Sequence, residues 1–376
     1  MADRLHTPLC DMLGIEYPIV LAGMAAGGQA QSTAPTPVKL VAAVTNAGGL
    51  GVMGDNFANL DELDAGIKEL RSLVGDRPFG VDFLLPAVRA EVTTTNKEEI
   101  YAQIERDHPN HVAVVEELIR EHGLERAGLG PSEPMSTDLL NRKIEVLLDN
   151  KVPVFAAALG DPAMMTERAH DQGMQVIGMV GAVRHAERHV AANVDIITAQ
   201  GTEAGGHTGY ISTMVLVPQV VDAVAPMPVL AAGGIGSGRH LATALALGAQ
   251  GAWVGTAFLT SEETNIPDDH QQQILGGQSS DFTTSKFMSG KNQRSYNNAV
   301  KQAWADSGLE NLDMPLQGIL QEPFTRAAKA AGRYDLVGNP SGQISGMLNE
   351  RRPAKDILMD MVNEARDTIE GLQKHL

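Results

Sequence analysis

Residues 195–209 read DIITAQGTEAGGHTG, and the rest of the chain can be interpreted outward from this stretch. Its apolar start predicts a buried strand that ends near Gln200. Its second half predicts a loop with four glycines that presents His207. Glycine lets a backbone approach a ligand closely, and histidine has the ordinary pKa that suits proton transfer near neutral pH. We interpret the stretch as an active-site loop, with a flexible turn and an incidental histidine as the alternative.

The composition is that of a globular, acidic chain. Of its 376 residues, 43% are hydrophobic and 20% are charged, which is ordinary for such proteins. The net charge of -17 argues against nucleic-acid or anionic-membrane partners, although a local pocket for one phosphate remains open. Cys10 is the only cysteine, which excludes an internal disulfide and a multi-thiolate metal site. No signal-peptide core and no run of about 20 apolar residues is found, so we expect a cytoplasmic protein.

Short apolar runs alternate with helical patterns along most of the chain. The runs are Pro18–Ala22, Gly48–Gly54, Phe79–Pro86, Val152–Leu159, Gln175–Val180, Asp195–Gln200, Pro228–Gly234 and Gly251–Leu259. Because they lack polar alternation, they predict parallel strands that are covered on both faces. Eight such units predict an α/β fold, a (β/α)8 TIM-type barrel, with a doubly wound open sheet as the alternative.

Two segments do not follow this alternation. Residues 87–137 after the third strand are charged and have helical patches at 97–104 and 111–121, which predicts an insertion that forms a surface or lid element. The tail after residue 262 is partly helical, notably at 355–372. We therefore expect a barrel over 1–262 and a C-terminal helical extension over 263–376 that packs on it. A subunit contact through the tail is an alternative role.

Candidate binding residues lie at the predicted strand ends, which form the working face of such a barrel. The seventh run ends in Gly233-Gly234-Ile235-Gly236-Ser237-Gly238 and leads into a predicted helix, while the eighth carries Gly255-Thr256. Loops after strands seven and eight are the usual phosphate site of this barrel, made by backbone N–H groups and a helix N-terminus. The glycines do not form the dinucleotide-binding pattern at a first strand–helix turn.

Other catalytic motifs are absent from the sequence. It contains no H-E-x-x-H, C-x-x-C, G-x-S-x-G or Walker lysine pattern. His185 and His189 are four residues apart on a predicted helix, but they lack a third ligand nearby, and we interpret them as a solvated face. Glu203 and His207 are close enough in sequence to pair, although the spacing alone does not establish a dyad. We expect no metal site.

These motifs together resemble the flavin-dependent nitronate monooxygenase family, once called 2-nitropropane dioxygenases. The same superfamily includes the flavin-dependent enoyl-acyl-carrier-protein reductases. The resemblance runs from Pro18 to Leu259 and returns near Ser341–Gly346. Its most specific part is Gln200–Gly209, followed by Ala231–Ile235 and Val254–Thr256.

The resemblance implies FMN bound across the barrel mouth. In that arrangement Gly23 and Met24 would lie along the flavin ring, and His207 would match the catalytic histidine. The other expected cofactor-binding residues are Asp82, Gln200, Gly205, Gly206, Gly233, Gly234, Gly255 and Thr256, the last four at the phosphate. Asp82 departs from the Asn or His that relatives often carry, and its carboxylate would disfavour an anionic reduced flavin unless it is protonated or paired.

The implied reaction is the oxidation of alkyl nitronates with O2 to a carbonyl compound and nitrite. His207 would abstract a proton from the nitro compound or position the anionic nitronate. An NAD(P)H-dependent FMN reductase of an enoyl thioester or a quinone is the alternative, with the same histidine as proton donor. A flavin- or phosphate-binding protein without turnover is less consistent with a histidine on this loop. The expected partners are a small-molecule substrate and O2, with NAD(P)H and a homo-oligomer left open.

Overall fold

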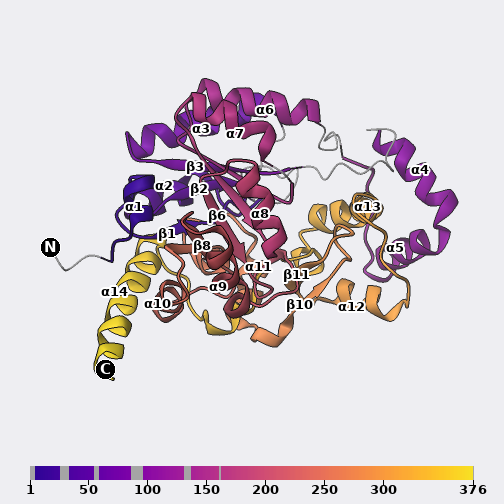
Figure 1. Cartoon of the computed structure of the whole chain (residues 1–376). Coiled ribbons are helices and arrows are strands. Elements are labelled where there is room, and N and C mark those ends of the chain that lie inside the picture. Colours follow the sequence, from indigo (N-terminus) through magenta and orange to yellow (C-terminus); the bar gives the residue numbers. More distant parts are fainter. Residues whose placement is uncertain are drawn as a thin grey trace.

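The structure is a computed structural model that describes residues 5–25, 34–54, 59–85, 96–130, 137–160 and 162–375. Eight parallel strands form one sheet in the order β1-β9-β8-β6-β5-β4-β3-β2. A bridge between Val20 and Leu50, directly before β2, joins the two ends of this order. The strands are β1 (Ile19–Leu21), β2 (Gly51–Gly54), β3 (Phe79–Leu84), β4 (Val154–Ala158), β5 (Gln175–Val180), β6 (Ile196–Gln200), β8 (Val229–Ala232) and β9 (Gly251–Val254). The predicted TIM-type barrel is therefore confirmed (Figure 1).

Helices cover the outside of the barrel between successive strands. They are α2 (Val38–Asn46), α3 (Leu60–Val74), α6 (Thr137–Asp149), α7 (Ala163–Asp171), α8 (Val183–Ala191), α9 (Thr213–Val224) and α10 (Gly238–Ala246), and α1 (Pro8–Leu13) precedes β1. The amphipathic pattern of α3 turns Leu63, Ile67 and Leu70 toward the core. The Asn59 side chain caps that helix by accepting a hydrogen bond from Glu62 N at 2.9 Å.

Some predicted boundaries differ from the structure. The eighth strand ends at Val254, and the apolar residues after it form a 3-10 helix, η2 (Thr256–Thr260). Helix α9 begins at Thr213 and contains Pro218. The third strand was predicted to reach Pro86, which lies outside the described residues. Residues 87–95 and 131–136 of the predicted insertion also lie outside them. Apolar content alone does not separate a short buried helix from a strand.

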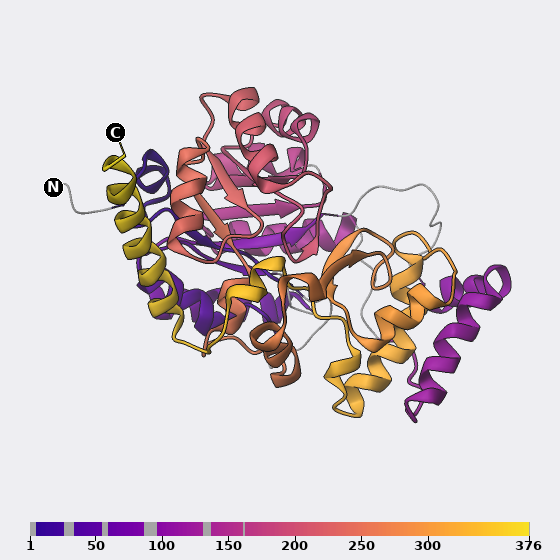
Figure 2. The same cartoon turned by 90° about the horizontal axis from the view of Figure 1, so that it is seen from below.

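The last helix, α14 (Ala354–Gln373), packs against α10 and α2. These two helices follow the seventh and first barrel strands, so α14 occupies the position of an eighth barrel helix. Its residues Leu358, Met361 and Val362 belong to the same hydrophobic core as the barrel strands. Figure 2 shows α14 along the side of the barrel at which both termini lie.

A second core lies beside the barrel and is formed by segments far apart in sequence. The predicted helical patches are found as α4 (Lys97–Asp107) and α5 (Pro109–Glu121), and both pack against α13 (Leu316–Ala330) of the tail. We call the buried set shared by these segments the second core: Ile100, Tyr101, Ile104, Val115, Leu118, Ile119, Phe287, Val300, Trp304, Leu312, Ile319, Leu320, Phe324, Ala328, Leu336 and Val337. Figures 1 and 2 both place α4, α5 and α13 at the opposite end of the molecule from α14.

A three-stranded antiparallel sheet connects the active-site loop to the tail. It has the order β10-β11-β7, and its strands are β7 (Gly206–His207), β10 (Phe282–Ser285) and β11 (Gln293–Tyr296). His207 pairs with Gln293, and Gly206 pairs with Arg294. The remaining tail elements are α11 (Asp268–Gly276), α12 (Ala299–Asp306), η3 (Ser279–Asp281), η4 (Tyr334–Leu336) and η5 (Gln343–Met347). The predicted loop around His207 is thus partly a strand edge, because the tail supplies its pairing partner.

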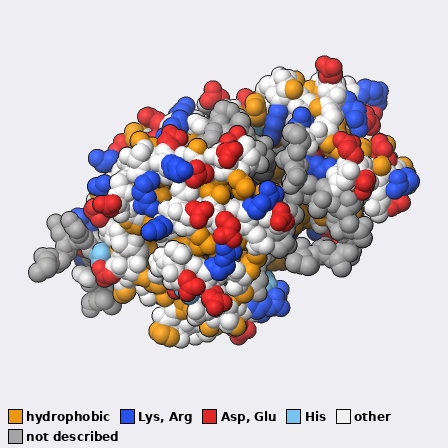
Figure 3. Space-filling model, turned by 90° about the horizontal axis from the view of Figure 1, so that it is seen from above, with side chains coloured by type: hydrophobic (Ala, Val, Ile, Leu, Met, Phe, Trp, Pro, Cys, Tyr) orange, Lys and Arg blue, Asp and Glu red, His pale blue; other side chains and the backbone are white. Residues whose placement is uncertain are grey.

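Charged side chains of both signs are interspersed over the face that Figure 3 shows. Within the described residues, no helix is long and apolar enough to cross a membrane. The same part of the chain holds no cluster of three or more His, Cys, Asp or Glu side chains that could bind a metal ion.

Candidate active site

Neighbouring strand ends bring most of the predicted binding residues together. In the barrel β8 pairs with β9, and β9 pairs with β1. Gly233, Gly255 and Gly23 therefore follow three adjacent strands at their carboxyl ends. Because none of the three has a side chain, neighbouring segments pack closely on Gly233 and Gly23, whereas a Cβ on Gly255 would meet no atom closer than 3.5 Å.

The turn after β8 has a backbone conformation that requires glycine. Gly233 and Gly234 have φ values of 97° and 70°. A Cβ on Gly233 would lie 2.8 Å from the carbonyl oxygen of Gly201, so the turn packs directly on the loop after β6. The hydroxyl of Thr213 lies 2.9 Å from Gly233 O and holds the turn from the start of α9.

Unpaired backbone donors remain at these two strand ends. Among the described residues, the N–H groups of Gly234 and Gly255 have no hydrogen-bond partner. The hydroxyl of Thr256 accepts a hydrogen bond from Gly342 N at 2.9 Å and keeps its own hydrogen for another acceptor. Neutral donors of this kind can bind a phosphate in an acidic protein.

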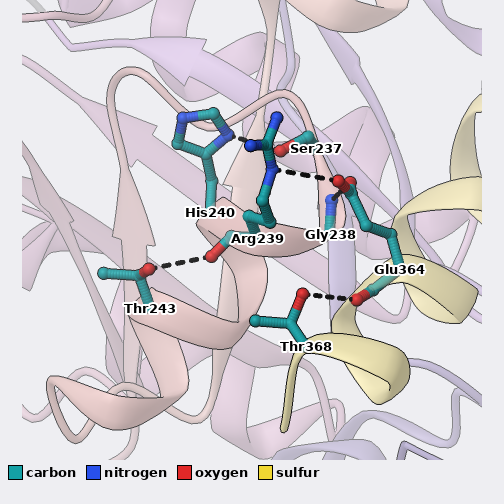
Figure 4. Close-up of polar contacts among 7 residues, drawn as sticks. All are labelled: Ser237, Gly238, Arg239, His240, Thr243, Glu364 and Thr368. Atoms are coloured by element: carbon teal, nitrogen blue, oxygen red, sulfur yellow. Dashed lines mark hydrogen bonds and ion pairs between the residues drawn. The ribbon is translucent and has the colours of Figure 1, made fainter. Parts of the chain in front are cut away.

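The start of α10 is not available to such an anion. Glu364 of α14 accepts a hydrogen bond from Gly238 N at 2.6 Å and pairs with Arg239 at 3.1 Å. Figure 4 shows Glu364 reaching from α14 to the first turn of α10, beside a contact of 2.8 Å between Ser237 and His240. A carboxylate from the same chain therefore takes the N–H group of Gly238, where the sequence predicted a phosphate contact.

A cavity of about 440 Å³ lies next to this contact. Its lining includes Ser237, Thr260, Arg352, Asp360 and Glu364, and none of the predicted site residues is part of the lining. The cavity lies on the α14 side of the loops after β8 and β9 and is separate from the predicted site.

The end of β1 also contacts the end of β3. A Cβ on Gly23 would lie 2.3 Å from the Cβ of Asp82, so Asp82 lies against the end of β1. Asp82 is buried, with 6% of its surface exposed. Met24 is positioned by Thr36, whose hydroxyl accepts from Met24 N at 3.2 Å and from Gly54 N at 3.1 Å. The sequence did not single out Thr36, which ties the ends of β1 and β2 together.

The glycine loop after β6 packs against the tail. A Cβ on Gly205 would lie 2.6 Å from the carbonyl carbon of Ser341, and a Cβ on Gly342 would lie 2.7 Å from Glu203 O. Gln343 N donates to Glu203 O at 3.0 Å. Gly205 therefore allows two backbone segments to pack closely, and the Ser341–Gly346 motif lies against the loop that it follows by more than a hundred residues.

Glu203 and His207 do not form a dyad. The Glu203 carboxylate accepts hydrogen bonds from Thr213 N at 3.0 Å and from the Thr213 hydroxyl at 2.8 Å. It thus caps α9, where a carboxylate is favoured by the helix dipole. His207 instead places Nε2 at 2.9 Å from the hydroxyl of Ser289 in the tail.

His207 is held at the end of β6 from two sides. The side-chain amide of Gln200 donates to His207 O at 2.7 Å, and β11 pairs with His207 on the other side. Burial, with the positive charge of Lys291 as a smaller cause, lowers the pKa of His207 to about 4. The imidazole is therefore neutral at neutral pH, and its remaining ring nitrogen can take part in hydrogen bonding or proton transfer.

Arg294 is a second residue that sequence reasoning missed. It is buried, and its guanidinium donates to Thr202 O at 3.0 and 2.9 Å and also to Phe282 O. These bonds attach the glycine loop to the small sheet. Burial lowers the pKa of Arg294, which nevertheless remains a cation because its ordinary value is far above neutral. A lone arginine in a polar segment has no local pattern that would reveal this role.

The sequence-based interpretation of the helical pair His185 and His189 is partly wrong. His189 is 5% exposed, and a Cβ on Gly178 would lie 2.2 Å from its Nδ1. The interpretation of His189 as part of a solvated face is therefore wrong. Helix α8 packs this side chain onto β5, at a strand position that glycine leaves open.

Comparison with known proteins identifies the family of the chain. The nitronate monooxygenase family model matches residues 6–364. A protein of Staphylococcus aureus named probable nitronate monooxygenase is 33% identical over 371 residues, which are 95% of this chain and 96% of that protein. The solved nitroalkane oxidase of Streptomyces ansochromogenes is similar at a TM-score of 0.81 and 28% identity, over 97% of this chain and 99% of that one. FabK of Thermotoga maritima, an enoyl-ACP reductase, is similar at a TM-score of 0.76 and 28% identity, over 99% of each chain. The chain belongs to the nitronate monooxygenase family.

Proposed function

We propose that this protein is an FMN-dependent monooxygenase that oxidises alkyl nitronates with O2 to a carbonyl compound and nitrite. Family membership supports an oxidoreductase of this kind and implies a flavin. The observation that carries the proposal is the position of a half-buried, neutral His207 at the rim that bears the free N–H groups of Gly234 and Gly255.

The residues present fit FMN. Gly233, Gly234, Gly255 and Thr256 would hold its phosphate, since two of these backbone donors have no partner among the described residues. Gly23 and Met24 would lie along the ring, next to Asp82. Gln200, Gly205 and Gly206 would contribute on the β6 side, although the Gln200 amide nitrogen already donates to His207 O. The bound flavin would supply the electron acceptor that nitronate oxidation requires and pass the electron to O2.

The chain's own residues would orient the substrate and manage its charge. A neutral His207 can donate a hydrogen bond from one ring nitrogen to an anionic oxygen without a competing charge of its own. Lys291 adds a positive charge that acts on His207, and the same charge favours an anionic ligand there. The partial burial of His207 lowers the local dielectric constant and so strengthens both interactions.

The alternative is an NAD(P)H-dependent FMN reductase of an enoyl thioester or a quinone. The similarity to FabK favours this alternative. Imidazolium is the stronger proton donor, and a pKa of about 4 makes imidazolium scarce at neutral pH. The electrostatics of His207 therefore favour the nitronate reaction.

Anaerobic reduction distinguishes the two activities. Purified protein is mixed separately with propyl nitronate, NADH and NADPH, and flavin bleaching is followed by absorbance. Bleaching by the nitronate is expected, whereas bleaching by a nicotinamide alone would refute the proposal. A preparation that binds no FMN on reconstitution would contradict both activities.

His207→Ala tests the role of the histidine. The variant is expected to retain bound FMN and to lose turnover by about 10²-fold or more, because a positioned proton-transfer or hydrogen-bonding group contributes on that scale. FMN content and kcat/KM are measured on the same preparation. Turnover at the original rate would show that His207 has only a structural role.

A further inference from the structure

Ser289 is the side chain that contacts the ring of His207. Its hydroxyl oxygen lies 2.9 Å from His207 Nε2. The same oxygen accepts hydrogen bonds from Lys291 N at 3.3 Å and from the Gln293 amide nitrogen at 3.2 Å. The carbonyl oxygen of Lys291, at 3.5 Å, is the other acceptor near this hydroxyl.

Counting donors and acceptors assigns the hydrogen between Ser289 and His207. A serine hydroxyl has one hydrogen and two lone pairs. The Lys291 and Gln293 donors fill both lone pairs, so the hydroxyl hydrogen must point to an acceptor. His207 Nε2 at 2.9 Å is within ordinary hydrogen-bond distance, whereas Lys291 O at 3.5 Å is at its limit. The reverse arrangement would bring three donors to two lone pairs.

We infer that Ser289 is a positioning residue that holds His207 as the neutral tautomer with its hydrogen on Nδ1. The Nε2 lone pair then accepts the Ser289 hydroxyl and is not available as a base. Nδ1 has no hydrogen-bond partner among the described residues, and it is not among their fully buried unpaired atoms. The ring therefore offers a ligand one neutral N–H donor.

The position of Ser289 is determined by the second core. Phe287, two residues earlier, is buried there, and its carbonyl oxygen accepts hydrogen bonds from Gln317 at 3.1 Å and Gln321 at 3.2 Å of α13. Gly290, the next residue, has a φ of 83°, and a Cβ there would lie 2.3 Å from Met314 N. The segment that carries Ser289 is thus anchored on both sides to tail residues outside the barrel.

This assignment rests on the proposed function and narrows its substrate class. An Nδ1–H donor binds a nitronate that is already anionic, and Lys291 adds a positive charge nearby. A neutral nitroalkane needs a ring lone pair to remove its carbon-bound proton, and Ser289 occupies that lone pair. The site therefore selects the ionised substrate over the neutral nitroalkane.

Nitrogen NMR of the histidine ring tests the tautomer without reference to activity. The flavin-loaded protein is labelled with ¹⁵N-histidine, and His207 is assigned by its loss in His207→Gln. A protonated, pyrrole-type Nδ1 and an unprotonated, pyridine-type Nε2 are expected. Ser289→Thr should preserve this pattern because it keeps the hydroxyl, whereas Ser289→Ala should shift it toward the other tautomer. A protonated Nε2 in the unmodified chain would overturn the inference.

Kinetics provide the second measurement. Ser289→Ala is expected to lower kcat/KM for propyl nitronate by roughly tenfold at unchanged FMN content, and Ser289→Thr should restore most of it. Ser285→Ala is the matched control, because Ser285 ends β10 four residues before Ser289 and its hydroxyl has no hydrogen-bond partner among the described residues. A Ser289→Ala variant with the tautomer and kcat/KM of the unmodified chain would refute the inference. Absence of any nitronate oxidation would instead refute the proposed function, and the NMR result would still stand.

Discussion

The barrel core and the second core are both closed by large apolar side chains, but they are assembled differently. In the barrel, Phe83 and Phe155 from adjacent strands meet edge to face at 5.8 Å. In the second core, Ile100 and Ile104 of one segment meet Phe324 of another more than two hundred residues later. The first arrangement follows the order of the strands along the chain. The second forms only when two segments that are distant in sequence pack together during folding.

The difference separates two parts of the site. Barrel strand ends supply the glycine-rich rim with Gly233 and Gly255, which suits a flavin phosphate. The small sheet and the second core supply Ser289 and Arg294, which hold the loop of His207. We therefore expect changes in the barrel to affect cofactor binding and changes near the second core to affect turnover. The following variants test this division, from the largest expected effect to the smallest.

Phe324→Ala removes a fully buried ring of the second core, in which 1% of the side chain is exposed. It should lower the free energy of unfolding by about 3–5 kcal/mol and reduce turnover more than FMN affinity. Phe155→Ala is the matched truncation in the barrel and should reduce both turnover and FMN affinity. Denaturant unfolding is followed by circular dichroism and flavin fluorescence. Equal losses of FMN by the two variants would contradict the division.

Arg294→Met removes three donated hydrogen bonds from the buried carbonyls of Thr202 and Phe282. A cost of about 2–3 kcal/mol is expected, because unsatisfied buried acceptors remain. Turnover should fall together with stability, since the glycine loop loses its attachment. Arg239→Met is the control, because the exposed pair of Arg239 with Glu364 contributes little. A stable, fully active Arg294→Met variant would show that β-pairing alone holds the loop.

Gly234→Val places a side chain in a turn with a φ of 70° and directs its Cβ to 3.2 Å from Glu203. The expected strain is about 1–3 kcal/mol, together with a clear loss of FMN affinity. Gly173→Val has a matching φ of 72° and no atoms within 4 Å, so it should show strain without loss of FMN. FMN titration of the apoprotein measures the FMN affinity of both variants. An unchanged affinity in Gly234→Val would place the phosphate elsewhere.

The pH dependence of turnover tests the environment of His207. Because its pKa is lowered to about 4, the imidazole stays neutral as pH falls, and the acid limb of kcat/KM should lie near pH 4 and not near 6.5. The stability that depends on the neutral ring is present above the unfolded value and is lost as pH falls toward the folded value. Lys291→Met should shift the limb slightly upward, since burial is the larger cause. A limb near 6.5 would show that the ring is solvated in the working enzyme.

The sequence predicted the barrel because its eight strands are local, apolar and regularly spaced. It also predicted candidate binding residues at strand ends, and Gly233 and Gly255 do follow β8 and β9, since parallel strands carry their carboxyl ends to one face. Errors occurred where a tertiary contact overrides the local pattern. Gly238 begins a helix as predicted, but Glu364 from α14 already caps it. His189 lies on a polar helix pattern, but Gly178 opens a buried position for it.

By itself, the sequence from Asp195 to Gly209 determined that a buried strand is followed by a glycine-rich loop that carries a histidine. Strand periodicity and glycine chemistry are properties of neighbouring residues, and they can be read without a structure. Only the tertiary structure decided that His207 is a paired, neutral residue whose ring nitrogen meets Ser289. Burial and hydrogen-bond partners come from segments more than eighty residues away, and no local pattern specifies which segments will meet.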